Sequence, residues 1–187
     1  VLDAAGNLVV PATSITNNQA WGTDDTLNVP AFYTPRIAAT GHNRFFLAWE
    51  REQQEATGTI DDVYYAVMSS SGSQIKGATR LTSSAAGTVT YVEPALTALS
   101  GDRVFLSWQR REDGNDDVLF AVLSTDGNIL KGATDLSQSD TIVDWRNWGA
   151  VELSDGRILA VWEGWGCYAD EWAPRIRYAV LDRSFNF

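Results

Sequence analysis

The stretch that decides the fold is "DDVLFAVLSTDGNILKGATDLSQS", residues 116–139, because the chain already contains nearly the same stretch, "DDVYYAVMSSSGSQIKGATRLTSS", at residues 61–84. Within it, "KGATRLT" (76–82) returns as "KGATDLS" (131–137), and "VPATSIT" (10–16) near the start has the same pattern. Internal repeats of this kind indicate a fold built from copies of one structural unit.

Three further kinds of segment recur in a fixed order, each in three copies. All are short, rich in β-branched and aromatic residues, and bounded by Gly, Asp, Asn or Ser, as strands joined by turns are. The first kind reads "PRIAAT" (35–40), "PALTAL" (94–99) and "GAVELS" (149–154); the second reads "RFFLAWE" (44–50), "RVFLSWQ" (103–109) and "RILAVWE" (157–163); the third reads "DVYYAVM" (62–68), "DVLFAVL" (117–123) and "RIRYAVL" (175–181). Each unit therefore has four strands, and the short turns favour antiparallel pairing.

Four-stranded antiparallel units that recur along a chain are typical of the blades of a β-propeller. We predict an all-β fold with one propeller module over 1–187 and three blade equivalents, at 35–82, 94–137 and 149–181. The strand order is circularly permuted, because the chain opens with the fourth-strand tract 10–16. A strand like this one, from the same chain or from a partner, is expected to complete the third blade. A stacked solenoid is the alternative architecture.

Three blades are too few to close a ring, since propellers have about four to eight. Either two copies form a six-bladed ring, or the chain is one arc of a longer repeat protein. The chain starts at Val1 rather than methionine, and its head "VLDAAGN" (1–7) overlaps in pattern with its tail "LDRSFNF" (181–187), as a cut through a tandem array also produces. We therefore expect a processed or excised segment that is a homo-oligomer or part of a longer propeller.

The segments "LSDGRILAVWE" (153–163) and "RYAVLD" (177–182), with a Gly-containing turn and an "ATxLT" tract, resemble the propeller-forming repeats of large secreted bacterial surface and adhesion proteins. The resemblance covers the whole chain through generic motifs and implies an extracellular or cell-surface location. The turns before the fourth strands are also similar in position to the Asp-box turns of sialidase-type propellers. "STDGNIL" (124–130) lacks the Thr-Trp end and the Ser-x-Asp spacing of that box, so sialidase activity is not implied.

Composition excludes several classes of partner. Of 187 residues, 24 are acidic and 14 are basic, and the net charge of −10 repels nucleic-acid phosphates and anionic membranes. No apolar run approaches the roughly 18 residues that span a bilayer, so neither nucleic acid nor membrane insertion is expected. The single cysteine, Cys167, cannot form an internal disulfide and supplies too few thiolates for a structural zinc site.

The two ends of the predicted blades differ in their connections. One end has short, near-identical turns, whereas the other is expected to carry long, unlike loops at 17–34, 51–61, 83–93, 110–116, 138–148 and 164–174. Binding and catalytic residues concentrate on long irregular loops. We therefore expect the functional surface at the long-loop end.

The tryptophans separate into two groups. Trp49, Trp108 and Trp162 hold one equivalent position in each unit and are expected to pack between blades. The others fall in the predicted loops, where aromatic faces beside polar groups suit sugar rings. The predicted ligand-binding residues are Trp21, Asp144, Trp145, Arg146, Trp148, Trp165, Tyr168, Asp170 and Trp172. Burial under their own loops, or at a seam between blades or subunits, is the alternative for these aromatics.

Acidic residues allow two further interpretations. Asp61-Asp62 and Asp116-Asp117 hold matching repeat positions, and "EDGND" (112–116) has the oxygen-rich composition of a calcium loop without the helix-loop-helix spacing. We expect solvated acidic loops and no cofactor, with calcium as the alternative. Loop carboxylates that could cleave a glycan as an acid and base pair are Asp24, Asp25, Asp144, Asp170 and Glu171.

Histidine-dependent catalysis lacks its residues. His42 is the only histidine, and it falls in a short turn at the end opposite Cys167, so neither a Cys-His pair nor a serine triad is expected. The first functional hypothesis is a non-enzymatic recognition or adhesion module that binds carbohydrate. The alternatives are a glycan-active hydrolase or lyase that uses loop carboxylates, and a purely structural repeat array.

Overall fold

The computed structural model describes residues 2, 4–16, 30–138, 143–168 and 171–187, and of residues 143–148, 165–168, 171 and 172 it describes the backbone alone. Within these residues eleven strands form three antiparallel sheets, and there is no helix. The described part of the chain accordingly contains no helix that could cross a membrane. The predicted all-β class is confirmed.

Each sheet pairs its strands in the order in which they follow along the chain. The first sheet contains β1 (Ala31–Thr40), β2 (Arg44–Glu55), β3 (Gly58–Ser69) and β4 (Gln74–Arg80). The second contains β5 (Val89–Leu99), β6 (Arg103–Glu112), β7 (Asn115–Ser124) and β8 (Ile129–Asp135). The third contains β9 (Val143–Glu152), β10 (Ile158–Tyr168) and β11 (Glu171–Leu181). The repeats of the sequence thus correspond to separate sheets.

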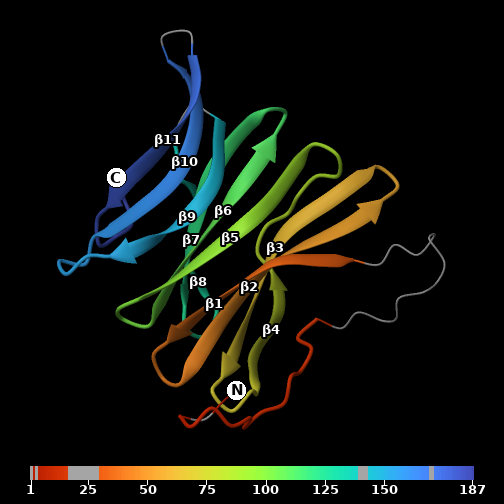
Figure 1. The fold of residues 1–187 in the computed structure, drawn as a ribbon, viewed down its shortest axis with the longest axis vertical. Helices are drawn as coiled ribbons and strands as arrows, with labels where there is room; N and C mark the ends of the chain where they lie inside the picture. The colour runs from red at the N-terminus through yellow and green to blue at the C-terminus, as the bar shows by residue number, and fades with distance from the viewer. Residues whose placement is uncertain (1, 3, 17–29, 139–142, 169–170) are drawn as a thin grey trace.

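The three sheets fan out from their first strands. β5 contacts both β1 and β9, so the first strands of the three sheets lie beside one another. β4 and β8 form the opposite edges of the first and second sheets, and β11 forms that edge of the third (Figure 1). This is the arrangement of neighbouring blades in a β-propeller, as the repeat pattern predicts.

The sheets pack face to face through two apolar layers. Trp108 is fully buried in the layer between the first and second sheets, and Trp162 is buried in the layer between the second and third. The first layer contains Phe46, Ala48, Val63, Tyr65, Val67, Val104, Leu106, Trp108, Ala121 and Leu123. The second contains Leu99, Phe105, Val118, Phe120, Val122, Leu136, Ile158, Ala160, Trp162, Leu181 and Phe185. We call the face of a sheet that carries its repeated tryptophan the back face, and the opposite face the front face. In each layer, the front face of one sheet packs against the back face of the next.

A buried carboxylate fixes the chain beyond β4. Asp62 is almost fully buried, forms an ion pair with Arg80, and accepts hydrogen bonds from the Thr82 hydroxyl at 2.8 Å and from the Ser84 backbone N–H at 2.8 Å. The Thr82 hydroxyl in turn accepts a bond from the Val63 backbone N–H at 3.0 Å. The expectation that Asp62 is a solvated loop residue was wrong, because its oxygens satisfy the backbone where β4 leaves the sheet.

The predicted long loops between the second and third strands of each unit were wrong. Residues 51–55 and 58–61 continue β2 and β3, so only Ala56 and Thr57 connect these strands; likewise, only Asp113 and Gly114 connect β6 to β7. The polar side chains here project from the ends of paired strands, and pairing continues because it depends on backbone register and not on side-chain polarity. Residues 143–148 and 164–168 are likewise in strands.

The tract 10–16 is not part of any sheet in this structure. It lies against the first sheet instead, where Val10 to Ile15 line a hollow of about 340 Å³ together with Phe45, Met68, Gly72 and Gln74. The bridge between Leu2 and Leu8 precedes it and has the same spacing as the pairs Met68–Gln74 and Leu123–Ile129, which begin the outer strands β4 and β8. The third sheet has no fourth strand within the described residues, so its completion stays a prediction.

Candidate functional site

Charged side chains gather at one end of the first and second sheets. We call it the Asp61 end: it is the end of the sheets at which β1, β5 and β9 begin and β2, β6 and β10 finish. Glu52 and Asp61 are directly opposite each other on β2 and β3, and Glu50 lies two residues before Glu52. Because strand neighbours at a spacing of two share a face, these carboxyl groups lie on the face that meets the second sheet.

Two bulges shape the inner strands at this end. The register of β1 shifts between Tyr33 and Arg36, and that of β5 shifts between Val92 and Ala95. Within the bulges, Thr34 and Glu93 have φ of 49° and 52°, a conformation that residues with a side chain adopt rarely. Bulges and positive-φ residues are found preferentially at sites where a side chain is re-aimed for function.

The bulges bring two sheets together around one carboxylate. Glu50 Oε2 accepts a hydrogen bond from the Thr34 hydroxyl at 3.4 Å and one from the backbone N–H of Glu93 at 3.3 Å. Arg111, from β6, lies 3.5 Å from Glu93 through Nη2 and donates to Gln109 Oε1 from Nε and Nη2 at 3.1 and 2.8 Å. The Asp61 end thus brings Glu50, Asp61 and Glu93 near the guanidinium of Arg111, with Glu52 beside Asp61.

The carboxyl groups differ in how strongly they hold a proton. Burial, followed by the charges of Glu52, Glu50 and Asp62, raises the pKa of Asp61 from 3.8 to about 6, against the opposing charge of Arg111. Asp61 Oδ1 is buried and has no hydrogen-bond partner among the described residues. Burial also raises the pKa of Glu50, which the hydrogen bonds from Glu93 and Thr34 counteract. Asp61 is therefore the carboxyl group most ready to carry a proton near neutral pH.

The second sheet has a different set at the equivalent positions. Asp116 corresponds to Asp61, and burial raises its pKa too, but its Oδ2 accepts a hydrogen bond from Gln109 Nε2 at 2.9 Å. Gln109 replaces Glu50, and Arg111 replaces Glu52. The concentration of acidic groups therefore belongs to the first sheet and its contact with the second.

The predicted ligand-binding residues lie at the same end of the third sheet, where they can be described only by backbone. Asp144, Trp145, Arg146 and Trp148 are in β9, Trp165 and Tyr168 are in β10, and Trp172 is in β11. The register puts Asp144 opposite Gly164, Arg146 opposite Glu163, and Cys167 opposite Trp172. Neighbouring strands therefore carry these residues, whereas Trp21 and Asp170 fall outside the described residues. Their binding role stays a prediction.

Sequence reasoning missed the groups that the structure brings together. Glu50 comes from the first sheet, whereas Glu93 and Arg111 come from neighbouring strands of the second, and nothing in the local sequence pairs them. The available signals were the prolines Pro35 and Pro94, which repeat directly after the two positive-φ residues, and the acidic residue at Asp61. Asp61 was expected to be solvated, but it is half-buried and its Oδ1 is enclosed.

The described residues contain no group of three or more histidine, cysteine, aspartate and glutamate side chains that could hold a metal ion. In the segment predicted as a possible calcium loop, Glu112 forms an ion pair with Arg110. His42 lies in the turn after β1, where its Nε2 is 2.9 Å from Asp102 Oδ2, at the end of the sheets opposite the Asp61 end.

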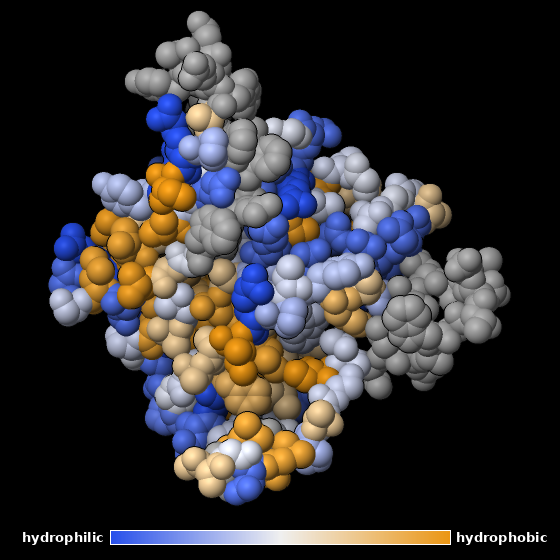
Figure 2. Space-filling view, viewed as in Figure 1, coloured by the Kyte–Doolittle hydropathy of each residue, from blue (hydrophilic) through white to orange (hydrophobic). Residues whose placement is uncertain are grey.

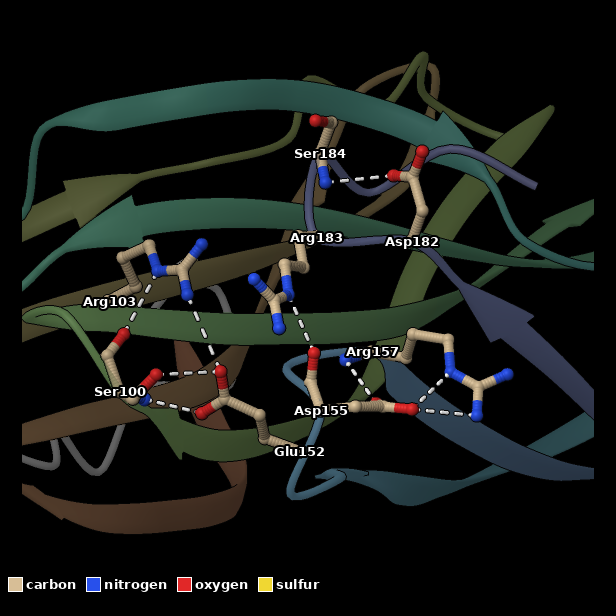
Figure 3. Close-up of polar contacts among 8 residues, drawn as sticks. All are labelled: Ser100, Arg103, Glu152, Asp155, Arg157, Asp182, Arg183 and Ser184. Carbon is tan, nitrogen blue, oxygen red and sulfur yellow. Dashed lines mark hydrogen bonds and ion pairs between the residues drawn. The ribbon is translucent and has the colours of Figure 1, made fainter.

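The opposite end of the sheets holds the second and third sheets together through short turns (Figure 3). Ser100 donates to Glu152 from its backbone N–H at 2.5 Å and from its hydroxyl at 2.7 Å, and Arg103 Nη2 lies 3.4 Å from the same carboxylate. Arg183 Nε donates to the carbonyl of Asp155 at 2.6 Å, which ties the end of the chain to the turn after β9. These contacts are structural and leave the Asp61 end as the candidate site.

Comparison with known proteins identifies no family. No protein-family model matches this chain, and no curated protein matches it. Among solved structures, an endo-arabinase from Bacteroides thetaiotaomicron has a TM-score of 0.48 and 14% identity over 79% of this chain and 56% of its own. An α-L-arabinofuranosidase from Podospora anserina, solved with cellotriose, has a TM-score of 0.29 and 10% identity over 86% of this chain and 67% of its own. This chain thus spans little more than half of the endo-arabinase, and likenesses this distant carry no argument about its activity.

Proposed function

We propose that this chain is part of a glycan-hydrolysing propeller whose reactive groups lie at the Asp61 end. The observation that supports this most is the pKa of about 6 at Asp61, in a cluster where an arginine lies beside a second carboxylate, Glu93. Glycoside hydrolysis needs one carboxyl group that keeps its proton and another that is ionised. This proposal extends the sequence-based alternative of a hydrolase to Asp61 and Glu93, neither of which the sequence analysis assigned to catalysis.

The roles follow from the surroundings of each group. Asp61 donates its proton to the glycosidic oxygen as the bond from that oxygen to the anomeric carbon breaks. Glu93, next to Arg111, takes the proton of the water that adds to the anomeric carbon, so that one water is consumed for each bond cleaved. Because the acidic groups near Arg111, which include Glu50, Asp61 and Glu93, outnumber this arginine, a neutral glycan suits the site better than an acidic one.

Glycan recognition without cleavage is the second candidate. It is favoured by the third sheet, where the backbone carries Trp145, Trp165 and Trp172 on three adjacent strands at the same end as Asp61. Aromatic residues on neighbouring strands can form a platform for sugar rings. Recognition and hydrolysis would then use one surface, with the tryptophans as binding residues.

The decisive experiment is product analysis on a panel of neutral and acidic polysaccharides that includes arabinan and cellulose. We expect release of oligosaccharides from a neutral glycan, fastest below about pH 6, where Asp61 is protonated. Asp61→Asn should lower the rate by about 100-fold or more, because a positioned general acid contributes roughly that much. The matched control, Asp116→Asn at the equivalent position of the second sheet, should retain most of the rate.

Binding measured by tryptophan fluorescence separates the remaining outcomes. Saturable quenching without any product supports recognition and contradicts hydrolysis. If neither quenching nor product is observed, both glycan functions are contradicted and the purely structural repeat array is the remaining hypothesis. Cleavage that Asp61→Asn does not change contradicts the assignment of Asp61.

A further inference from the structure

We infer that the exposed front face of the third sheet binds the back face of the first sheet in a second copy of this chain. The two faces lie at opposite ends of the row of three sheets, and each lacks the neighbour that the corresponding faces have inside the molecule. The second copy would supply both the following sheet and the missing outer strand of the third sheet. This inference is independent of the function proposed above.

The molecule itself shows what the front face of the third sheet is built to contact. Val63, Tyr65 and Val67 on β3 are buried because the second sheet covers them, and the equivalent residues on β7 are buried by the third sheet. On β11 the equivalent residues are Ile176, Tyr178 and Val180, and nothing described covers them: Ile176 is 72% exposed and Tyr178 is 71% exposed. A face that is covered in two sheets is therefore left open in the third.

Other apolar residues extend this open face. Leu159 and Val161 of β10 lie opposite Val180 and Tyr178, and they line a hollow of about 510 Å³ that reaches Ile37 on β1. Figure 2 shows apolar residues gathered over the third sheet, at the left of the view. Contiguous exposed apolar surface on a soluble domain is typical of an interaction site.

The back face of the first sheet carries the complementary group. Trp49 is the equivalent of Trp108 and Trp162, each of which packs into the front face of a preceding sheet. No sheet precedes the first one within the described residues, and a hollow of about 280 Å³ lies there, lined by Leu47, Trp49 and the tract 10–16 among others.

The tract 10–16 already lies where the outer strand of a preceding sheet belongs. Ile15 corresponds in the repeat to Leu81 and Leu136, which follow the outer strands β4 and β8 and pack into the layers beside Trp108 and Trp162. Ile15 lines the hollow that contains Trp49. The first sheet therefore holds an outer-strand segment without its sheet, and the third sheet lacks an outer strand. Two copies joined head to tail satisfy both needs.

The repeat also gives the register of the joint. Thr79 pairs with Tyr65, and Thr134 pairs with Phe120, so Thr13 of one copy should pair with Tyr178 of the other. The backbone N–H of Leu81 donates to Val63 at 2.8 Å, and that of Leu136 donates to Val118 at 2.7 Å. Ile15 should therefore donate to the backbone carbonyl of Ile176 across the joint.

The mass of the particle in solution is the first test. Light scattering and sedimentation should give about twice the monomer mass of 20.5 kDa, or a larger multiple if the head-to-tail joint does not close. Tyr178→Glu should return the particle to 20.5 kDa without changing its circular dichroism, because this side chain is exposed in the single copy. Leu130→Glu, which changes an exposed apolar residue on the outer strand β8, is the matched control and should leave the assembly intact.

Cross-linking tests the register separately. When Thr13→Cys protein is mixed with Tyr178→Cys protein and oxidised, a reducible dimer of the two variants should form, whereas the wild type and either variant alone should give little. A monodisperse 20.5 kDa particle, an assembly unaffected by Tyr178→Glu, or the absence of the cross-link each overturns the inference. If the protein is a monomer, the open front face of the third sheet must be covered by something other than a second copy, such as a further sheet of a longer chain.

Discussion

Ser100 and Glu152 join the second and third sheets through two hydrogen bonds, from the serine backbone N–H at 2.5 Å and from its hydroxyl at 2.7 Å (Figure 3). Desolvation of Glu152 acts to raise its pKa, but these bonds and the nearby Arg103 outweigh it and hold the pKa below the ordinary value of 4.5. The ionised form of Glu152 is therefore the form that the folded state favours.

Glu152→Gln should lower the free energy of unfolding at pH 7 by about 1 kcal/mol, as the loss of charge-assisted hydrogen bonds typically does. Because the pKa of Glu152 is depressed in the folded state, its contribution is present above about pH 4.5 and is lost as the pH falls through the folded-state pKa. Urea denaturation at pH 7 and at pH 3 measures this. If Glu152→Gln lowered the free energy of unfolding equally at pH 7 and at pH 3, the charge of Glu152 would have no role in stability.

Asp61→Asn should have the opposite effect on stability. The pKa of Asp61 is raised to about 6, so the folded state binds more protons than the unfolded state between about pH 4 and 6, and stability falls as the pH rises through that window. The substitution removes this penalty. It should raise the free energy of unfolding at pH 7.5 by about 1 kcal/mol after solvent screening, and by little at pH 4.

Thermal melts at the two pH values test the effect at Asp61. Asp113→Asn is the control, because Asp113 is exposed in the turn between β6 and β7 and should change the melting temperature little at either pH. If Asp61→Asn is destabilising at pH 7.5, the carboxylate is a structural partner of Arg111, and its proposed catalytic role loses its support.

Asp62→Ala should be among the most destabilising changes of an acidic residue. It would leave Arg80, Thr82 and the backbone N–H of Ser84 without their shared acceptor at a buried position. The expected loss is about 3 to 5 kcal/mol, because a buried charge network is broken from one side. Chemical denaturation measures it, with Glu55→Ala at the exposed end of β2 as the control. A loss below about 1 kcal/mol would show that the end of β4 is held by other contacts.

Trp108→Ala should unfold the protein more readily, whereas Trp145→Ala and Trp172→Ala should weaken glycan binding. Trp108 is fully buried between two sheets, and truncating such a residue costs about 3 to 5 kcal/mol. Loss of a stacking surface costs about 1 to 3 kcal/mol, or roughly five- to a hundredfold in affinity. A melt and a binding titration on each variant are needed. Equal loss of stability in all three would make Trp145 and Trp172 packing residues.

The internal repeat specifies much of the fold through local features of the sequence. The four-strand unit, the short turns at one end of the sheets and the burial of Trp49, Trp108 and Trp162 all follow from such features. Period-two alternation and turn residues act within a few residues of one another, so a single chain displays them directly. The equivalence of three copies then reinforces each assignment.

Strand ends were harder to predict, for a physical reason that residues 51–61 illustrate. Their polar composition is typical of a loop, yet they continue β2 and β3 because backbone pairing extends until the turn at Ala56–Thr57 reverses the chain. Polar side chains at the end of a sheet cost little when they remain near solvent. The polar composition of residues 51–61 therefore indicated side chains near solvent, but such side chains are carried here by paired strands and not by a loop.

The sequence by itself determined a repeated, all-β chain with tryptophans at equivalent positions. Only the tertiary structure decided which charges meet, because strand pairing brings Glu93 beside Arg111 and the packing of the first sheet on the second brings Glu50 to them, not their spacing along the chain. The same holds for the pKa of Asp61, which depends on burial and on neighbouring charges, and for the open face of Tyr178. Local pattern specifies each sheet, whereas desolvation and long-range contact arise only when the sheets are packed.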